Sequence, residues 1–187
     1  MIQKTILVII NLVFGSMVIL SYAHNWIKIK KLLGLQTNEQ VGRALWGGVP
    51  EPLQPIIFAI MFISAAGYFF FTYNFLFNVD TNKVFLETFS YSSLHFLYLL
   101  IFIPSMVWMG LTVDYINSEK SFYDWAVIVL VLFTVGVASL LLFLFTLDLK
   151  TESGGMYLVY VLGSAIFAFH TLFLDALLWT TFFHRGS

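Results

Sequence analysis

Residues 125–147 have the sequence WAVIVLVLFTVGVASLLLFLFTL, which contains no charged side chain. An α-helix rises about 1.5 Å per residue and the hydrocarbon core of a bilayer is about 30 Å thick, so this run is long enough to cross a membrane once. Residues 140–145 are apolar on every face, whereas a barrel strand would alternate apolar and polar residues. The run therefore predicts a transmembrane α-helix.

Four further apolar segments of similar length lie elsewhere in the chain. They cover residues 5–23, 55–78, 89–113 and 156–183, and charged or polar residues separate them. Of all residues, 60% are hydrophobic and 10% are charged, whereas about a quarter are charged in soluble proteins. We therefore predict an all-α integral membrane bundle of five transmembrane helices. It forms a single domain over residues 1–187 and has a long, ordered first loop at residues 24–54.

The first segment also fits a secretory signal peptide. Lys4 precedes the apolar stretch, and Ser21-Tyr22-Ala23 places small residues where a signal peptidase cleaves. The apolar stretch is long for a signal peptide, so a retained membrane helix is the favoured interpretation.

Lys and Arg are distributed unevenly between the two ends of the predicted bundle. One end carries Lys28, Lys30, Lys31, Arg43, Lys120 and Arg185, and the other carries Lys4, Lys83 and Lys150. Because cytoplasmic loops are enriched in these residues, we expect the first loop and the C-terminus in the cytoplasm and the N-terminus outside.

The composition excludes several classes of function. A net charge of −1 gives no basic surface for nucleic acid. Because the chain has no cysteine, disulfides, thiolate metal sites and cysteine redox chemistry are excluded. The sequence also lacks the G-x-S-x-G, H-E-x-x-H, P-loop and G-x-G-x-x-G motifs. No reaction is indicated, and whether the protein is an enzyme stays open.

Asp175 is the one carboxylate inside the last apolar segment. An unpaired charge at that depth is costly, so we expect a partner or a function for it. Three interpretations stay open: a structural hydrogen bond to a neighbouring helix, contact with a ligand, and passage of protons or ions. His24 and Arg43 are its candidate partners, since they belong to the same end of the bundle.

Polar and aromatic residues recur at helical spacing within the apolar segments. His95 and Tyr98 belong to such a stripe in the third segment, and Thr171, Asp175 and Trp179 belong to one in the fifth. Such stripes face the interior of a membrane bundle. Together with residues of the first loop and the second segment they give the candidate ligand-binding residues, which are Asp175, His24, Trp46, Arg43, Thr171, Trp179, Tyr68, His95 and Tyr98.

His95 and His170 come from different predicted helices, as the two axial ligands of a haem can. Their expected depths differ by about 10 Å, and in an α-helix His170 lies about 100° around the axis from the Thr171 and Asp175 stripe. A haem is therefore not favoured, and the sequence predicts no cofactor. A dinuclear metal site is also not favoured, because the segments supply too few carboxylates.

The first loop ends in residues 45–55, LWGGVPEPLQP. Pro50, Pro52 and Pro55 predict a rigid, non-helical entry to the second helix, and Gly47-Gly48 permits a tight turn. Two interpretations stay open, an interfacial segment anchored by Trp46 and a lid over a cavity between the helices.

Five helices, a long first loop, high aromatic content and Pro55 followed by Tyr68 in a small-residue segment are similar to the architecture of the tryptophan-rich translocator proteins. That resemblance covers the first eighty or so residues and implies a lid formed by the first loop over a porphyrin or sterol-like ligand. The last three segments lack the family's tryptophan and asparagine pattern, so no residue role is transferred.

The stripes together predict a membrane protein that binds an apolar or aromatic small molecule, such as a lipid, sterol-like or porphyrin-like ligand, in an intramembrane cavity. The alternatives are an accessory subunit or assembly factor of a larger membrane complex, an enzyme acting on lipid through His95 and Tyr98, and a proton pathway through Asp175. Expected partners are membrane lipid, the ligand, and further copies of the chain or other membrane subunits; nucleic acid is not expected.

Overall fold

The computed structural model describes residues 2–149 and 154–185, apart from the side chains of residues 184 and 185. Lys150 and the side chain of Arg185, which entered the comparison of charge between the two ends, thus lie outside the described part. In chain order the elements are α1 (Ile2–Leu32), α2 (Asn38–Trp46), η1 (Glu51–Leu53), α3 (Gln54–Tyr73), η2 (Asn74–Asn78), β1 (Val84–Phe85), β2 (Phe89–Ser90), α4 (Ser93–Ile116), α5 (Phe122–Leu147), η3 (Gly154–Met156), α6 (Tyr157–Ala168), η4 (Phe169–Trp179) and α7 (Thr180–Arg185).

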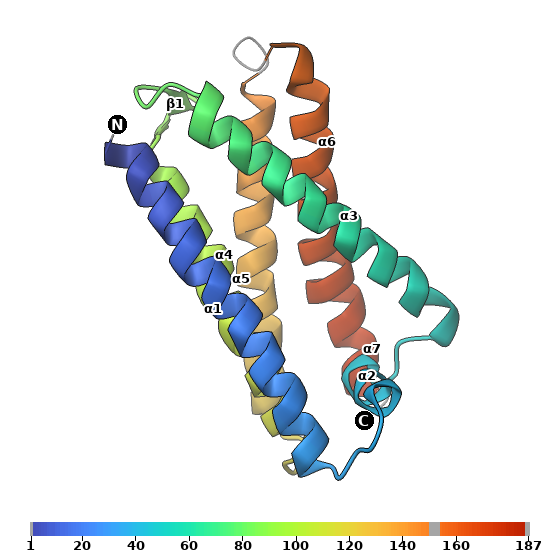
Figure 1. Ribbon diagram of the computed structural model, residues 1–187. Helices are drawn as coiled ribbons and strands as arrows, with labels where there is room; N and C mark the ends of the chain where they lie inside the picture. The colour runs from blue at the N-terminus through green and yellow to red at the C-terminus, as the bar shows by residue number, and fades with distance from the viewer. Residues whose placement is uncertain (1, 150–153, 186–187) are drawn as a thin grey trace.

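Within the described residues, five helical stretches are long and apolar enough to cross a membrane, which confirms the predicted all-α membrane bundle. They run alternately down and up in Figure 1. η1, α3 and η2 form one continuous stretch, and so do α6, η4 and α7. The five stretches are Ile2–Leu32, Glu51–Asn78, Ser93–Ile116, Phe122–Leu147 and Tyr157–Phe183.

The boundaries of two helices differ from the sequence expectation. α1 continues through Trp26 and the lysine cluster to Leu32, because long lysine side chains can remain in a helix while their charges reach water. It ends before Gly34, whose φ of 63° breaks the helix. The expected third segment begins instead as the short strand β2, paired with β1, and α4 starts at Ser93.

The first loop contains a helix, α2, that was not expected from the sequence. The Thr37 side chain accepts a hydrogen bond from the Gln40 backbone, and the Gln40 side chain accepts one from the Thr37 backbone, which closes a capping box. The expected non-helical entry to the second span is wrong, because η1 is a 3₁₀ turn that leads directly into α3. Proline is compatible with this position, since the N–H groups of the first residues of a helix have no hydrogen-bond partner within the helix.

Glycines allow the closest contacts between the spans. A Cβ placed on Gly67 of α3 would lie 2.6 Å from the carbonyl oxygen of Gly163 in α6, and one on Gly136 of α5 would lie 2.8 Å from the Cα of Leu172 in η4. Small residues at these positions let two backbones meet, as in many membrane bundles. α1 packs mainly on α4, and α3 packs mainly on α6, so α1 and α3 diverge from the upper end of Figure 1 toward the lower end.

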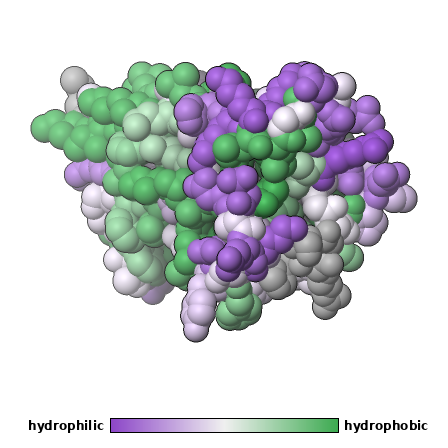
Figure 2. Space-filling view, turned by 90° about the horizontal axis from the view of Figure 1, so that it is seen from below, coloured by the Kyte–Doolittle hydropathy of each residue, from purple (hydrophilic) through white to green (hydrophobic). Residues whose placement is uncertain are grey.

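The two ends of the bundle are capped differently. At the upper end the β1–β2 hairpin stacks Phe85 on Phe145 of α5, with ring centroids 4.6 Å apart, and Lys83 pairs with Asp148 at 3.2 Å. At the lower end, hydrophilic side chains gather over much of the face seen in Figure 2. Lys28 of α1 pairs there with Asp114 of α4, which ties those two helices together near the membrane boundary.

Candidate intramembrane site

Asp175 pairs with His170 of its own helix. The His170 Nδ1 atom lies 3.1 Å from the Asp175 Oδ2 atom. Residues 169–179 form a π-helix, whose hydrogen bonds join residue i to residue i+5, so two side chains five positions apart lie on the same side of the helix. The expectation that His170 points about 100° away from the Asp175 stripe is therefore wrong, because it assumed α-helical geometry throughout.

The Asp175 side chain points toward the bundle and still remains accessible. Phe169, Phe173 and Leu177 are exposed and mark the outer face of η4. On the opposite side, Thr171 and Trp179 each keep 7% of their surface, yet the Asp175 side chain keeps 35%. The carboxyl group is thus accessible to a small molecule.

A tyrosine and a tryptophan from two other spans complete the polar surroundings of Asp175. Trp108 of α4 donates its indole N–H to the hydroxyl oxygen of Tyr22 of α1 at 2.7 Å. Trp108 also packs edge to face on Trp179, which lies about one turn after Asp175 in η4, with ring centroids 5.5 Å apart. We call Asp175, His170, Tyr22 and Trp108 the Asp175 site.

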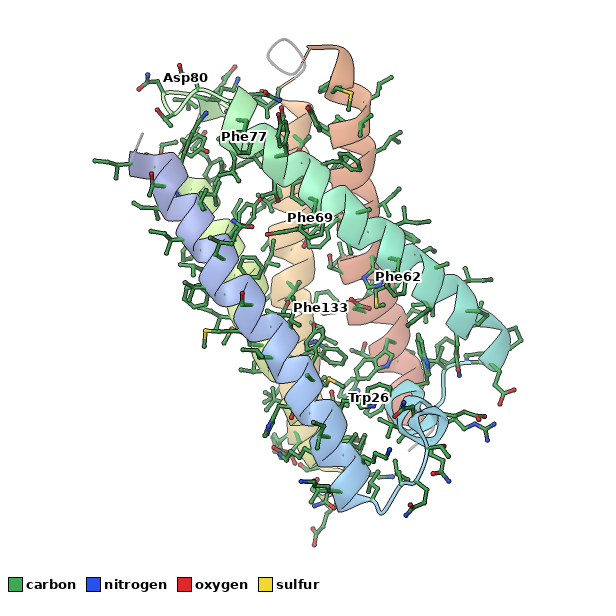
Figure 3. All side chains as sticks on the ribbon, in the orientation of Figure 1. Trp26, Phe62, Phe69, Phe77, Asp80 and Phe133 are labelled. Carbon is green, nitrogen blue, oxygen red and sulfur yellow. The ribbon has the colours of Figure 1, made fainter. Side chains whose placement is uncertain are left out.

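The Asp175 site lies in the lower half of the bundle, within the apolar spans. Asp175 is eight residues, or about 12 Å, above Phe183 at the end of its span, and Tyr22 is six residues, or about 9 Å, above Lys28. The hydrocarbon core is about 30 Å thick, so the carboxyl group is expected within it, nearer to its lower boundary than to its centre. In Figure 3, Phe133 of α5 is seen between α1 and η4 at the level of this lower half.

The first loop is anchored below the Asp175 site. The Trp179 indole N–H donates to the backbone oxygen of Leu45 at the end of α2, at 3.0 Å. Trp179 also stacks on Phe183 with ring centroids 4.3 Å apart, and Trp46 packs against the same apolar cluster. Gly47, with φ 55°, permits the turn that brings the loop against Phe183. α2 is seen end-on beside the C-terminal end of the chain in Figure 1.

The other aromatic candidates form a separate cluster nearer the upper end. Tyr68 of α3 donates to the side chain of Asn11 of α1, and the hydroxyls of Thr72 and Tyr98 lie 2.7 Å apart. The ring of Tyr68 also contacts that of Phe167 at 5.6 Å. This cluster closes the bundle where α1 and α3 are nearest, and it belongs to a different hydrophobic core from that of Trp46 and Trp179.

Three of the sequence-predicted residues do not approach Asp175. His24 is exposed, and Arg43 pairs with Glu39 at 2.7 Å on the exposed face of α2. The His95 Nε2 atom lies 2.8 Å from the Gln3 backbone oxygen at the upper end. Asp175 thus has the His170 side chain as its partner, and neither His24 nor Arg43.

The structure separates the two histidines that the sequence suggested as haem ligands. His95 lies in the first turn of α4, whereas His170 lies about 20 Å below the start of α6. They do not face each other across one iron position. Within residues 2–149 and 154–185, no three His, Asp or Glu side chains are grouped closely enough to hold a metal ion.

Sequence reasoning placed Tyr22 near the end of the first helix but did not select it, and it did not select Trp108. No signal in the sequence pointed to these residues together, since the predicted segment 5–23 places Tyr22 at its end, whereas Asp175 lies eight residues from the end of segment 156–183. The contact of Tyr22 with Trp108 became apparent only in the tertiary structure.

A groove of about 430 Å³ lies away from the Asp175 site, at the upper end between α4 and α5. Phe96, Leu97 and Leu141 line it, with Ser92 and Ser93 at the start of α4. Its walls are almost entirely apolar and it is open on one side. It lacks the convergent polar groups that orient a ligand, so we do not place the candidate site there.

The chain matches no protein-family model, no curated protein and no solved structure. The function is therefore argued from the geometry of the Asp175 site.

Proposed function

We propose that this multi-pass membrane protein binds an apolar small molecule, such as a lipid, sterol-like or porphyrin-like compound, with its polar group at the Asp175 site. The observation that carries the proposal is the accessibility of the Asp175 side chain, which keeps 35% of its surface on the inward side of η4, within the last span. A carboxylate facing hydrocarbon is costly, and a polar group of a ligand would offset that cost.

The surroundings of Asp175 support the same proposal. Ligand sites combine apolar and aromatic walls with a few polar groups, and here Trp108 and Trp179 meet edge to face with ring centroids 5.5 Å apart. The anchored first loop lies beneath them and would separate a bound ligand from the aqueous phase at the lower end. In this proposal Trp46 and Trp179 hold the loop, while Tyr68 and Tyr98 close the opposite end.

Native mass spectrometry of the protein, extracted in mild detergent from its own membrane, tests the proposal. We expect a small molecule in stoichiometric amount on the unaltered protein. Asp175→Ala and Trp108→Ala should each lose it. Asp124→Ala is the matched control, since Asp124 is an exposed carboxylate in the first turn of α5. An absorption spectrum of the same sample identifies a porphyrin.

Equal retention of the small molecule by all of these variants would rule out the Asp175 site. Absence of any bound molecule from the unaltered protein, together with larger polypeptides in the same complex, would favour the second candidate function.

That second candidate is an accessory subunit or assembly factor of a larger membrane complex. It is favoured by the exposure of α1, whose most apolar stretch is only 11% buried because α1 packs mainly on α4. Phe58, Phe62 and Phe69 on α3 are likewise exposed, and Figure 3 shows Phe62 and Phe69 on that helix. A partner subunit would cover these faces, and Asp175 would then contact a polar residue of that subunit.

A further inference from the structure

We infer that the ligand of the Asp175 site is a lipid-soluble amine, whose ammonium group pairs with the Asp175 carboxylate. The inference rests on the proposed function and adds the chemical class of the ligand. It follows from the negative charge that Asp175 brings into the last span, and from the fact that no Lys or Arg of the described residues pairs with it.

Asp175 differs in position from the other charged residues of the spans. Every other Asp, Glu, Lys or Arg in the five described spans lies within five residues of an end, where water can reach it. Asp175 lies eight residues before Phe183 and eighteen residues after Tyr157. Its side chain still keeps 35% of its surface. A charge at this position requires a counter-charge, since hydrocarbon does not solvate it.

The basic side chains of the lower end do not supply that counter-charge. Lys28 pairs with Asp114 of α4, and Arg43 pairs with Glu39 of its own helix α2. In the part of the chain that the structure describes, the side chain of His170 is the one basic group that lies against the Asp175 carboxylate.

His170 balances the charge of Asp175 only when its ring is protonated. The His170 Nδ1 atom lies 3.1 Å from the Asp175 Oδ2 atom. With a neutral imidazole the pair keeps one negative charge, and a ligand with one positive charge makes the whole assembly neutral. In this inference the imidazole holds the carboxylate in place and the ligand supplies the counter-charge.

An ammonium group matches the carboxylate better than an alcohol or a metal ion does. It donates up to three hydrogen bonds, and a bond between two charged groups is about twice as strong as a neutral one. An alcohol can donate one hydrogen bond but leaves the negative charge uncompensated. A metal ion would need several ligands, and the described residues bring no three His, Asp or Glu side chains together.

Aromatic side chains beside Asp175 also favour a cationic ligand. Trp179 follows Asp175 by four residues, about one turn, so the two side chains lie on the same side of η4. The ring of Trp108 lies 5.5 Å from that of Trp179, in an edge-to-face arrangement. Tryptophan rings attract cations through their faces, whereas an anionic ligand would be repelled by the carboxylate.

The inference is tested with three photoreactive probes that share one hexadecyl chain bearing a diazirine: the amine, the alcohol and the carboxylic acid. The protein is reconstituted in phosphatidylcholine nanodiscs at pH 7, where an alkyl amine is protonated. Peptide mass spectrometry maps the saturable labelling near Asp175. On the unaltered protein we expect half-maximal labelling by the amine at a concentration about 10-fold lower than by the alcohol, the difference that a charge-assisted hydrogen bond produces.

Asp175→Asn tests the role of the charge, because the amide has nearly the same shape and no negative charge. This variant should lose the preference for the amine and should bind the alcohol as before. Asp124→Asn is the matched control, since Asp124 is an exposed carboxylate in the first turn of α5. It should retain the full preference for the amine.

The probe series on the unaltered protein decides the matter even where Asp175→Asn fails to fold. Equal saturable labelling near Asp175 by all three probes, or preference for the alcohol, would overturn the amine inference and leave the proposed binding function standing. Preference for the carboxylic acid would overturn it in favour of an anionic ligand beside a charged His170. No saturable labelling near Asp175 by any probe, with no small molecule on the natively extracted protein, would overturn both.

Discussion

The imidazole Nδ1 of His170 lies 3.1 Å from a carboxylate oxygen of Asp175, five residues further along the same span. The pair exists because residues 169–179 wind as a π-helix, and an α-helix would place these side chains on different faces. π-helical turns are rare and are frequent at functional sites. Here the turn gives a carboxyl group inside the last span a partner on its own helix.

The first prediction concerns the stability of the pair. His170→Leu should lower the free energy of unfolding by about 1–3 kcal/mol, because Asp175 then lacks its partner in a low-dielectric environment. The double variant His170→Leu/Asp175→Leu should be more stable than His170→Leu alone, since an apolar pair leaves no polar group unsatisfied. Thermal unfolding in detergent measures both. A double variant no more stable than the single one would contradict the pairing.

The second prediction concerns the glycine contact between α3 and α6. Gly67→Ala should destabilise the fold by about 1–3 kcal/mol, because the new Cβ would meet the Gly163 backbone at 2.6 Å and the two helices would have to separate. Gly42→Ala is the control, since nothing lies within 4 Å of a Cβ at that position in α2 and alanine favours a helix. Thermal unfolding of the two variants checks the prediction, and similar melting temperatures would count against this packing.

The third prediction concerns the anchoring of the first loop. Trp179→Phe removes the indole N–H that donates to the Leu45 backbone oxygen, which should weaken the docking of α2 by about 0.5–1.5 kcal/mol. Amide hydrogen exchange should then become faster in residues 38–46 and remain unchanged in the β1–β2 hairpin at the opposite end. Tyr123→Phe should leave both regions as they are. Unchanged exchange in α2 would show that the loop is held by other contacts.

The fourth prediction concerns orientation in the membrane. Lys28, Lys30, Lys31 and Arg43 lie at the lower end, so we expect that end to face the cytoplasm. The chain has no cysteine, and single cysteines can therefore report sidedness. An impermeant maleimide should label Asn82→Cys on intact cells, whereas it should label Gln36→Cys only after permeabilisation. The reverse pattern would invert the topology.

Sequence reasoning predicted the fold class and the approximate spans because hydrophobic length is a one-dimensional property. It was less successful within the first loop. The capping box at Thr37 and Gln40 was present in the sequence, yet α2 was not recognised because the loop was described by its prolines and glycines. Asp175 was selected as an unusual residue, and the partner expected for it, His24 or Arg43, was wrong because it was chosen from its end of the bundle alone.

The sequence by itself determined that this chain is a five-span, all-α membrane protein with one acidic residue deep in its last span, since composition and the length of apolar runs suffice for both conclusions. Only the tertiary structure decided that Asp175 faces His170, and that Tyr22 and Trp108 share its surroundings. The physical reason is that the Asp175–His170 pair depends on a local change from α- to π-helical winding. The placement of Tyr22 and Trp108 depends on the rotation of α1 and α4 about their axes. Packing between helices sets that rotation, and a uniform apolar pattern around a membrane helix carries little information about it.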